Sequence, residues 1–239
     1  MTNNRILAFS SSRVGDGGYL EAVAPIVNEF LGGSKLQVAF LPFASVANDA
    51  EAYAEMVTSG LNNPAYQIKI VQPEHAKEMV ETADVIMVGG GNTFKLLYDI
   101  YQLKLLDIIR DKVNKGIPYI GWSAGANILG PSIGTTNDMP IVEPKSFNAL
   151  GLFPFQINPH YNNEKPSGHN GETRDQRLQE FLKMNPGVPI VALPEGTALK
   201  MQDAKLSFLG IKSGLLFSAA ENEMERKEID PGTDISFLF

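Results

Sequence analysis

The sequence contains no cysteine, which excludes disulfide bonds, thiolate metal sites and a thiolate nucleophile. It has only three histidines, so few side chains can serve as a general base. No apolar run approaches the ~20 residues that a membrane-spanning helix needs. Residues 1–18 hold only a short apolar run and lack the hydrophobic segment of a signal peptide. We therefore expect a cytoplasmic protein.

Positive charge is also scarce. The 20 Lys and Arg residues are outnumbered by 27 Asp and Glu residues, the net charge is -7, and no basic cluster stands out. This balance argues against nucleic acid and anionic membranes as partners. The 239 residues suffice for one large α/β domain or two small ones. Because no repeat, low-complexity segment or linker interrupts the chain, we expect a single domain over residues 1–239.

Short apolar runs alternate with longer amphipathic segments in the first half of the chain. The runs predict strands at residues 5–10, 35–45, 67–72, 84–92 and 117–122. The segments between them predict helices at residues 19–33, 49–61 and 73–83, and one or two helices within 93–116. Alternation of strands and helices is typical of a parallel sheet with helices on both faces. The uninterrupted apolar character of the strands agrees, because both faces of such a sheet are covered.

The second half of the chain is less regular. Beyond Ala126 it is rich in Pro, Asn and Gly, which indicates long loops around a strand at residues 153–159. A helix is expected at 172–185 and an apolar strand at 189–194. The tail, residues 196–239, alternates with a short period and predicts antiparallel hairpins.

The segment Gly121-Trp122-Ser123-Ala124-Gly125 matches the nucleophile-elbow pattern G-x-S-x-G. In that pattern a sharp strand-to-helix turn exposes the serine hydroxyl, and small flanking residues prevent collisions with neighbouring elements. The predicted strand before Ser123 and the helical pattern after it suit this interpretation. The alternative is a tight turn in which Ser123 only caps a helix.

His160 is the strongest candidate for the general base that a serine nucleophile needs. It ends the apolar run FPFQINPH, where a proline-fixed turn can hold it at the edge of the sheet. His75, on a polar helix face, and His169, in a glycine-flanked loop, are both expected to be solvated. The alternative for His160 is a hydrogen-bonded structural histidine.

Two carboxylates are candidates for orienting that base. Asp138 lies in a loop of short polar residues, TTNDMP, and Glu195 directly follows an apolar strand in ALPEG. Either could accept a hydrogen bond from the histidine. Asp138 could instead form an Asx turn, and Glu195 could be a surface charge at a hairpin end. The residues alone do not decide between the two.

The glycine run in VGGGNTF follows the fourth predicted strand. Glycines there let the backbone approach a ligand closely and direct N–H groups toward it. The spacing matches neither the dinucleotide pattern nor a phosphate loop with lysine, so nucleotide binding is only weakly indicated. An oxyanion hole shared with the N–H of Ala124 suits the pattern better. The alternative is a turn that simply leads into a helix.

Several of these motifs together resemble a known family. VGGGNTF, YIGWSAGAN, TTNDMPIV, LFPFQINPH, GETRDQR and LPEG occur in the order and at the spacing seen in the aspartyl dipeptidase (peptidase E) family of serine peptidases. The resemblance implies a flavodoxin-like or class I glutamine amidotransferase-like α/β fold with a nucleophile elbow. It implies hydrolysis of dipeptides with an N-terminal aspartate, without a metal or other cofactor.

The resemblance also assigns roles to individual residues. Ser123 matches the family's nucleophile and His160 its base, while Glu195 and Asp138 both match positions proposed for the third member. We favour Glu195, because a carboxylate at a strand end is held more firmly. Asp138 is then left to shape the site or to bind the amino group of the substrate.

The same resemblance implies a substrate-binding and an oxyanion set. Gly91 and Ala124 match the family's oxyanion donors, Arg174 matches a residue suited to the β-carboxylate of the substrate, and Asn92 is placed beside the substrate. The fork of an arginine suits a carboxylate in a pocket independently of the resemblance. Without the family, a helix-surface ion pair of Arg174 with Glu172 or Asp175 would be favoured.

Three other functions remain open at this stage. One is an α/β-hydrolase-type esterase, because Ser123, Asp138 and His160 follow the chain order of its triad. The others are a hydrolase of β-linked aspartyl polymers, such as a cyanophycinase, and a non-catalytic module that binds a small ligand. For the main hypothesis the only partner expected is a small peptide, and no oligomeric state is predicted.

Overall fold

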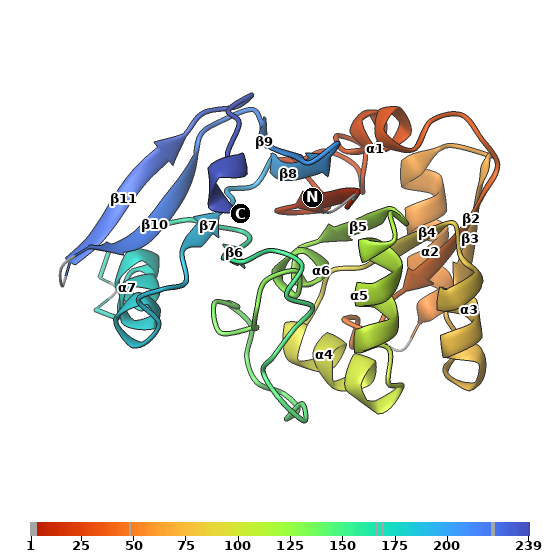
Figure 1. Cartoon of the computed structure of the whole chain (residues 1–239), viewed down its shortest axis with the longest axis horizontal. Helices are drawn as coiled ribbons and strands as arrows, with labels where there is room; N and C mark the ends of the chain where they lie inside the picture. Colours follow the sequence, from red (N-terminus) through yellow and green to blue (C-terminus); the bar gives the residue numbers. More distant parts are fainter. Residues whose placement is uncertain (1–3, 48, 166, 169, 221–222) are drawn as a thin grey trace.

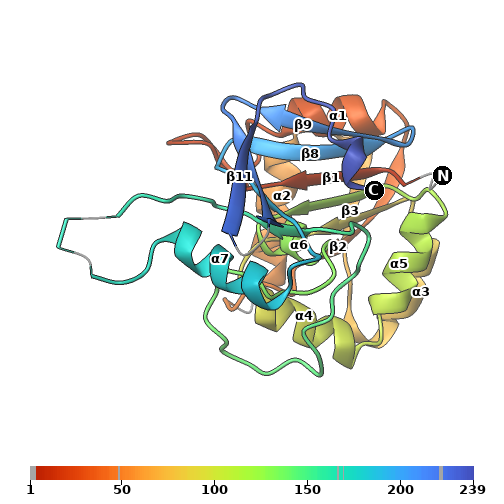
Figure 2. The same ribbon diagram turned by 60° about the vertical axis from the view of Figure 1, so that its left-hand side comes forward.

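The computed structural model describes residues 4–47, 49–165, 167–168, 170–220 and 223–239. Its main sheet has seven strands in the order β3-β2-β4-β5-β1-β8-β9. The strands are β1 (Ile6–Phe9), β2 (Leu36–Leu41), β3 (Tyr66–Ile70), β4 (Val85–Val88), β5 (Tyr119–Trp122), β8 (Thr197–Gln202) and β9 (Lys205–Gly210). The first five in chain order are mutually parallel, whereas β8 runs antiparallel to β1 and β9 antiparallel to β8. Figure 2 shows β9, β8 and β1 side by side. The predicted parallel sheet is thus confirmed.

Helices cover both faces of this sheet, as Figure 1 shows. They are α1 (Ala24–Leu31), α2 (Ala50–Leu61), α3 (Ala76–Thr82), α4 (Thr93–Gln102) and α5 (Leu106–Asn114), with a short 3-10 turn, η1 (Pro73–His75), before α3. α1 and α2 bury their apolar sides in one cluster with alternate strand residues, and α3, α4 and α5 do the same in a second cluster. Both strand faces are buried, which explains their unbroken apolar sequences.

A second sheet, with the order β11-β10-β7-β6, lies at the other end of the molecule together with α7 (Figure 1). Its strands are β6 (Gln156–Asn158), β7 (Ile190–Ala192), β10 (Gly214–Ala220) and β11 (Glu223–Ile229), and α7 is Arg174–Met184. The chain ends in a 3-10 turn, η2 (Ser236–Leu238). The expected tail hairpins are present, and β8–β9 joins the main sheet while β10–β11 joins the second. β6 and β7 pair in parallel, so their carboxyl ends point the same way.

The largest difference from an expected helix boundary is at the start of the first helix. The helix expected from residue 19 begins only at Ala24. Leu20 has φ 56°, outside the right-handed helical region, and its N–H donates to the carbonyl of Ser12 at 2.7 Å. Pro25 then lies in the first turn, where its missing N–H costs no hydrogen bond.

Within the part of the chain that the structure describes, no helix is both long and apolar enough to cross a lipid bilayer. The cytoplasmic location stays a prediction.

Candidate active site

Ser123 occupies the sharp turn between β5 and the short helix α6 (Ala124–Asn127). Its φ of 54° and ψ of -113° are strained for a residue with a side chain. The flanking glycines make the turn possible: a Cβ on Gly121 would lie 2.4 Å from the carbonyl oxygen of Gly125, and one on Gly125 would lie 2.2 Å from that of Val88. The local sequence thus folds as a nucleophile elbow at the carboxyl edge of the main sheet.

His160 lies between the serine and a carboxylate. Its Nε2 is 2.9 Å from Oγ of Ser123, and its Nδ1 is 2.9 Å from Oε1 of Glu195. The serine follows β5, whereas the histidine follows β6 and the glutamate follows β7. Because Asn158 of β6 is in register with Ala192 of β7, the residues just past the two strand ends come together. The His160 and Glu195 side chains are 41% and 53% exposed, so the hydrogen-bonded chain is open to solvent.

The backbone of His160 is held by a residue that sequence reasoning missed. His160 has φ 51°, and its N–H donates to Oγ of Ser10 at 2.9 Å. The Ser10 hydroxyl in turn donates to the carbonyl of Leu193 at 2.7 Å, and the residue is fully buried. Ser10 follows β1 directly, and its position as a polar residue just after a buried strand is the sequence feature that could have marked it as a candidate site residue. It ties His160 to the main sheet.

Among the described residues Asp138 forms no hydrogen bond with His160, whose Nδ1 is paired with Glu195. The Oδ2 of Asp138 accepts hydrogen bonds from the backbone N–H of Thr93 at 2.7 Å, from the Thr93 hydroxyl at 2.6 Å and from the Thr136 hydroxyl at 3.2 Å. Thr93 is the first residue of α4, so the carboxylate stabilises a helix N-terminus. The Ser-Asp-His arrangement of the esterase alternative is therefore not assembled.

The glycine run lies against the elbow. A Cβ on Gly90 would be 3.0 Å from Cβ of Ser123, and Gly91 has φ 138° and lies close to the carbonyl of Ala44. A side chain at Gly91 would have its Cβ 2.3 Å from that carbonyl oxygen, so only glycine fits. Ala124 is the first residue of α6, where N–H groups have no intrahelical acceptor.

Asn92 connects two elements beside this run. Its Oδ1 accepts from the N–H of Lys95 at 3.0 Å and caps α4, while its Nδ2 donates to the carbonyl of Met139 at 2.8 Å. These contacts explain the residue structurally, and its expected contact with substrate stays a prediction.

Arg174 begins α7 and is half-buried. Burial, together with the positive charge of Arg177, lowers the pKa of the Arg174 guanidinium. Among the described residues it forms no ion pair: Glu172 pairs with Arg177 at 3.8 Å, and Asp175 pairs with Arg226 at 3.5 Å. The surface ion pair considered from the sequence is therefore absent, and the cation is suited to an incoming carboxylate.

A short contact places the start of α7 near the histidine. Tyr161, the residue after His160, donates its hydroxyl to Oδ1 of Asp175 at 2.5 Å. The N–H of Asp175 also donates to Oδ1 of Asn163 at 2.9 Å. Burial, with a contribution from Asp175, raises the pKa of Tyr161. The tyrosine therefore remains a donor at neutral pH, and it joins the neighbour of His160 to the neighbour of Arg174.

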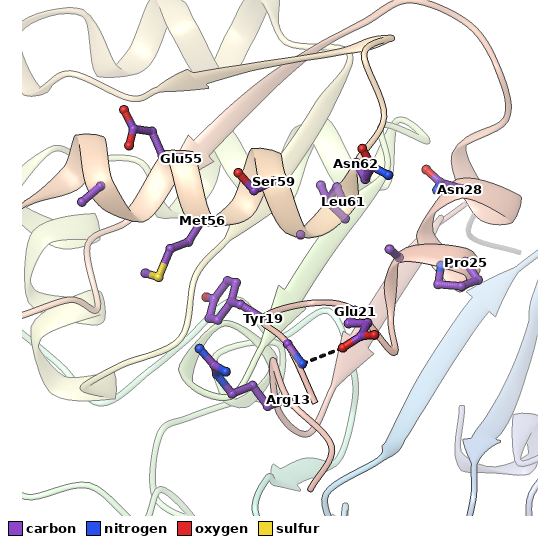
Figure 3. A pocket seen from close by; sticks show the side chains of 14 residues that line it. Arg13, Tyr19, Glu21, Pro25, Asn28, Glu55, Met56, Ser59, Leu61 and Asn62 are labelled. Atoms are coloured by element: carbon purple, nitrogen blue, oxygen red, sulfur yellow. Dashed lines mark hydrogen bonds between the residues drawn. The ribbon is translucent and has the colours of Figure 1, made fainter. Parts of the chain in front are cut away.

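His75 and a large cavity lie outside this site. His75 ends η1 and is exposed, as expected, while His169 falls outside the described residues. A cavity of about 900 Å³ is lined by residues of α1, α2 and the loop before α1, including Tyr19 and Met56 (Figure 3). Its lining includes neither Ser123 nor His160 nor Glu195.

Ser123 is a strained serine at a strand–helix turn of a parallel α/β sheet, and it is hydrogen-bonded through a histidine to a carboxylate. This arrangement is that of a serine hydrolase. Comparison with known proteins shows to which family of serine hydrolases the chain belongs. The model of Peptidase family S51 matches residues 6–209, and the chain belongs to this family.

Curated relatives agree with this assignment. A Peptidase E of Nostoc sp. is 44% identical over 241 residues and covers 100% of this chain and 97% of its own. A Peptidase E of Shewanella denitrificans is 48% identical over 231 residues, covering 96% of this chain and 97% of its own. A crystal structure of a peptidase from an acI-B1 Actinobacterium has a TM-score of 0.70 at 18% identity, covering 99% and 98% of the two chains, and supports the fold. The protein is therefore a serine-type dipeptidase.

Proposed function

We propose that the protein hydrolyses dipeptides with an N-terminal aspartate, with Ser123 as nucleophile, His160 as base and Glu195 as the residue that orients His160. The observation that carries this proposal is the continuous chain of two 2.9 Å contacts from Ser123 through His160 to Glu195. A histidine held between a hydroxyl and a carboxylate takes the proton of the first and is stabilised as a cation by the second.

The reaction begins when Ser123 attacks the peptide carbonyl carbon and its proton passes to Nε2 of His160. The N–H groups of Gly91 and Ala124 receive the oxyanion, and each such donor is worth roughly 3 kcal/mol in comparable sites. Protonated His160 then gives its proton to the leaving amine as the C–N bond breaks. The remaining aspartyl ester on Ser123 is hydrolysed by water, with His160 again acting as base.

Arg174 supplies the preference for aspartate in this proposal. Its half-buried guanidinium lacks an acidic partner among the described residues, and α7 is joined to Tyr161 beside the base. A substrate β-carboxylate would pair with the fork in two parallel hydrogen bonds. Glu195 is already committed to His160, and Asp138 to α4 and Thr136, so neither competes for the cation.

A panel of four substrates tests the proposed function. Release of free Asp from Asp-Leu and from a β-aspartyl dipeptide, release of free Ala from Ala-Leu, and hydrolysis of a nitrophenyl ester are measured for wild type and Ser123→Ala. We expect wild type to act on Asp-Leu far faster than on the two other dipeptides, and Ser123→Ala to lose that activity. Ester turnover without Asp-Leu turnover would instead indicate an esterase, and no turnover by a folded protein would indicate a binding module.

Arg174→Ala should lower kcat/KM for Asp-Leu about 100-fold, mainly through KM, because a charge-assisted bidentate pair is lost. The same variant should lose most of its preference for Asp-Leu over Asn-Leu. Arg177→Ala is the matched control, since it removes an exposed arginine of the same helix that pairs with Glu172. The ratio of kcat/KM values for the two dipeptides is the measurement. An unchanged ratio in Arg174→Ala would rule out this role.

A further inference from the structure

Tyr53 makes a contact with the glycine run that the proposed mechanism does not use. Its hydroxyl donates to the carbonyl oxygen of Gly90 at 3.0 Å. The residue lies on α2 and is 7% exposed, and its ring packs edge-on against Phe40 with centroids 5.1 Å apart. A rigid, buried donor therefore holds one peptide group at the carboxyl edge of the sheet.

The peptide group it holds is the one that carries the Gly91 N–H. In a trans peptide the carbonyl and the following N–H lie in one plane and point in opposite directions, and the chain has no cis peptide bond in its described residues. Holding the Gly90 carbonyl on the Tyr53 side therefore directs the Gly91 N–H to the other side. Rotation of that plane would break the bond to Tyr53.

The fit between Tyr53 and the glycines is close. A Cβ on Gly89 would lie 2.5 Å from the Tyr53 hydroxyl oxygen, so the phenol lies against the glycine run where a side chain would otherwise stand. On its other side the hydroxyl accepts from Nε1 of Trp122 at 3.2 Å. Because Trp122 immediately precedes Ser123, one hydroxyl joins the elbow to the glycine run.

The second oxyanion donor is held in a comparable way. The N–H of Ala124 belongs to the peptide whose carbonyl is that of Ser123. That carbonyl accepts from the N–H groups of Ala126 at 3.0 Å and Asn127 at 2.9 Å. The helix backbone thus secures one peptide plane, whereas the other depends on a side chain.

We propose that Tyr53 is a positioning residue for the oxyanion hole, which fixes and polarises the Gly90–Gly91 peptide so that its N–H meets the tetrahedral intermediate. The inference rests on the proposed role of Gly91. Hydrogen bonds in series strengthen one another, so a donor on the carbonyl makes the N–H of the same peptide a better donor. Burial raises the pKa of Tyr53, and the phenol therefore keeps its proton at neutral pH.

Tyr53→Phe tests this inference, because it removes only the hydroxyl and leaves the ring. Nε1 of Trp122 keeps an acceptor, the hydroxyl of Tyr19 at 3.0 Å, so no buried donor is left unpaired. Tyr66→Phe is the matched control: it removes another tyrosine hydroxyl that donates to a glycine carbonyl, that of Gly32. Tyr66 is the first residue of β3, so it lies at the edge of the parallel sheet opposite the carboxyl ends that carry the site.

We expect Tyr53→Phe to lower kcat about tenfold, less than the loss of a whole oxyanion donor, with KM within twofold of wild type. Affinity for a substrate-like peptide aldehyde, whose hemiacetal oxygen on Ser123 mimics the oxyanion, should fall by a similar factor. Tyr66→Phe should leave both quantities within twofold. Thermal unfolding of both variants checks that each remains folded at the assay temperature.

A Tyr53→Phe enzyme with kcat within twofold of wild type would overturn the inference, and so would a change confined to KM or an equal loss in Tyr66→Phe. The comparison can use whichever substrate the wild type turns over through Ser123. A failure of Asp-X specificity would therefore show in the substrate panel and leave the Tyr53 comparison intact.

Discussion

Ser123→Ala is expected to lower kcat for the best dipeptide substrate by a factor of about 10⁴ or more, because removal of the nucleophile leaves only binding and the oxyanion donors. The fold should persist, since His160 is the one hydrogen-bond partner of the Ser123 side chain among the described residues and the elbow is shaped by its flanking glycines. Single-turnover and steady-state release of the N-terminal amino acid measure the loss.

Ser59→Ala is the matched control for this variant. Ser59 is an exposed serine of α2 and, within the described part of the chain, forms no hydrogen bond with Ser123, His160 or Glu195. Its kcat should equal that of wild type. Substantial turnover by a highly purified Ser123→Ala protein would contradict the serine mechanism, and a matching loss in Ser59→Ala would show that the effect is unspecific.

Glu195→Gln should lower kcat about 100- to 1,000-fold, the second largest effect that we expect. Loss of the carboxylate in a buried triad costs about 10⁴, but the Glu195 side chain is 53% exposed and water can replace part of its effect. The amide also cannot stabilise the protonated ring of His160 as a carboxylate does. The measurement is kcat at saturating substrate.

Asp138→Asn serves as the comparison for Glu195→Gln. An amide oxygen at position 138 can still accept from Thr93 and Thr136, so kcat should fall less than tenfold. The melting temperature should fall slightly, because a negative charge at the start of α4 is lost. If Asp138→Asn lost more kcat than Glu195→Gln, the assignment of the orienting carboxylate would be reversed.

Local patterns predicted much of the fold. The apolar runs from 5–10 to 117–122 became the five parallel strands, because a strand buried on both faces needs apolar residues throughout. The start of α1 differed from the prediction because Leu20 adopts a positive φ, and a hydrophobic pattern contains no information on backbone angles. The distribution of the tail hairpins over two sheets also depends on pairing between distant segments.

In the candidate site, too, some features could be predicted from the local sequence and others could not. The pattern G-x-S-x-G predicted the elbow at Ser123, because its steric requirements lie within five residues of chain. The pairing of His160 with Glu195 rather than Asp138 depends on the parallel register of β6 and β7. The local sequence could mark Ser10 as a polar residue after a buried strand, but it could not show the hydrogen bond to His160, which lies 150 residues further along the chain.

The sequence by itself determined the parallel α/β core, the elbow serine, the candidate base and the family resemblance, because each follows from short-range spacing. Only the tertiary structure decided which carboxylate reaches His160, that Arg174 has no ion pair within the described residues, and that Tyr53 holds the Gly90 carbonyl. The physical reason is that a hydrogen bond forms only when folding brings its donor and acceptor to within about 3 Å of each other. The separation of two residues along the chain does not show whether folding brings them that close.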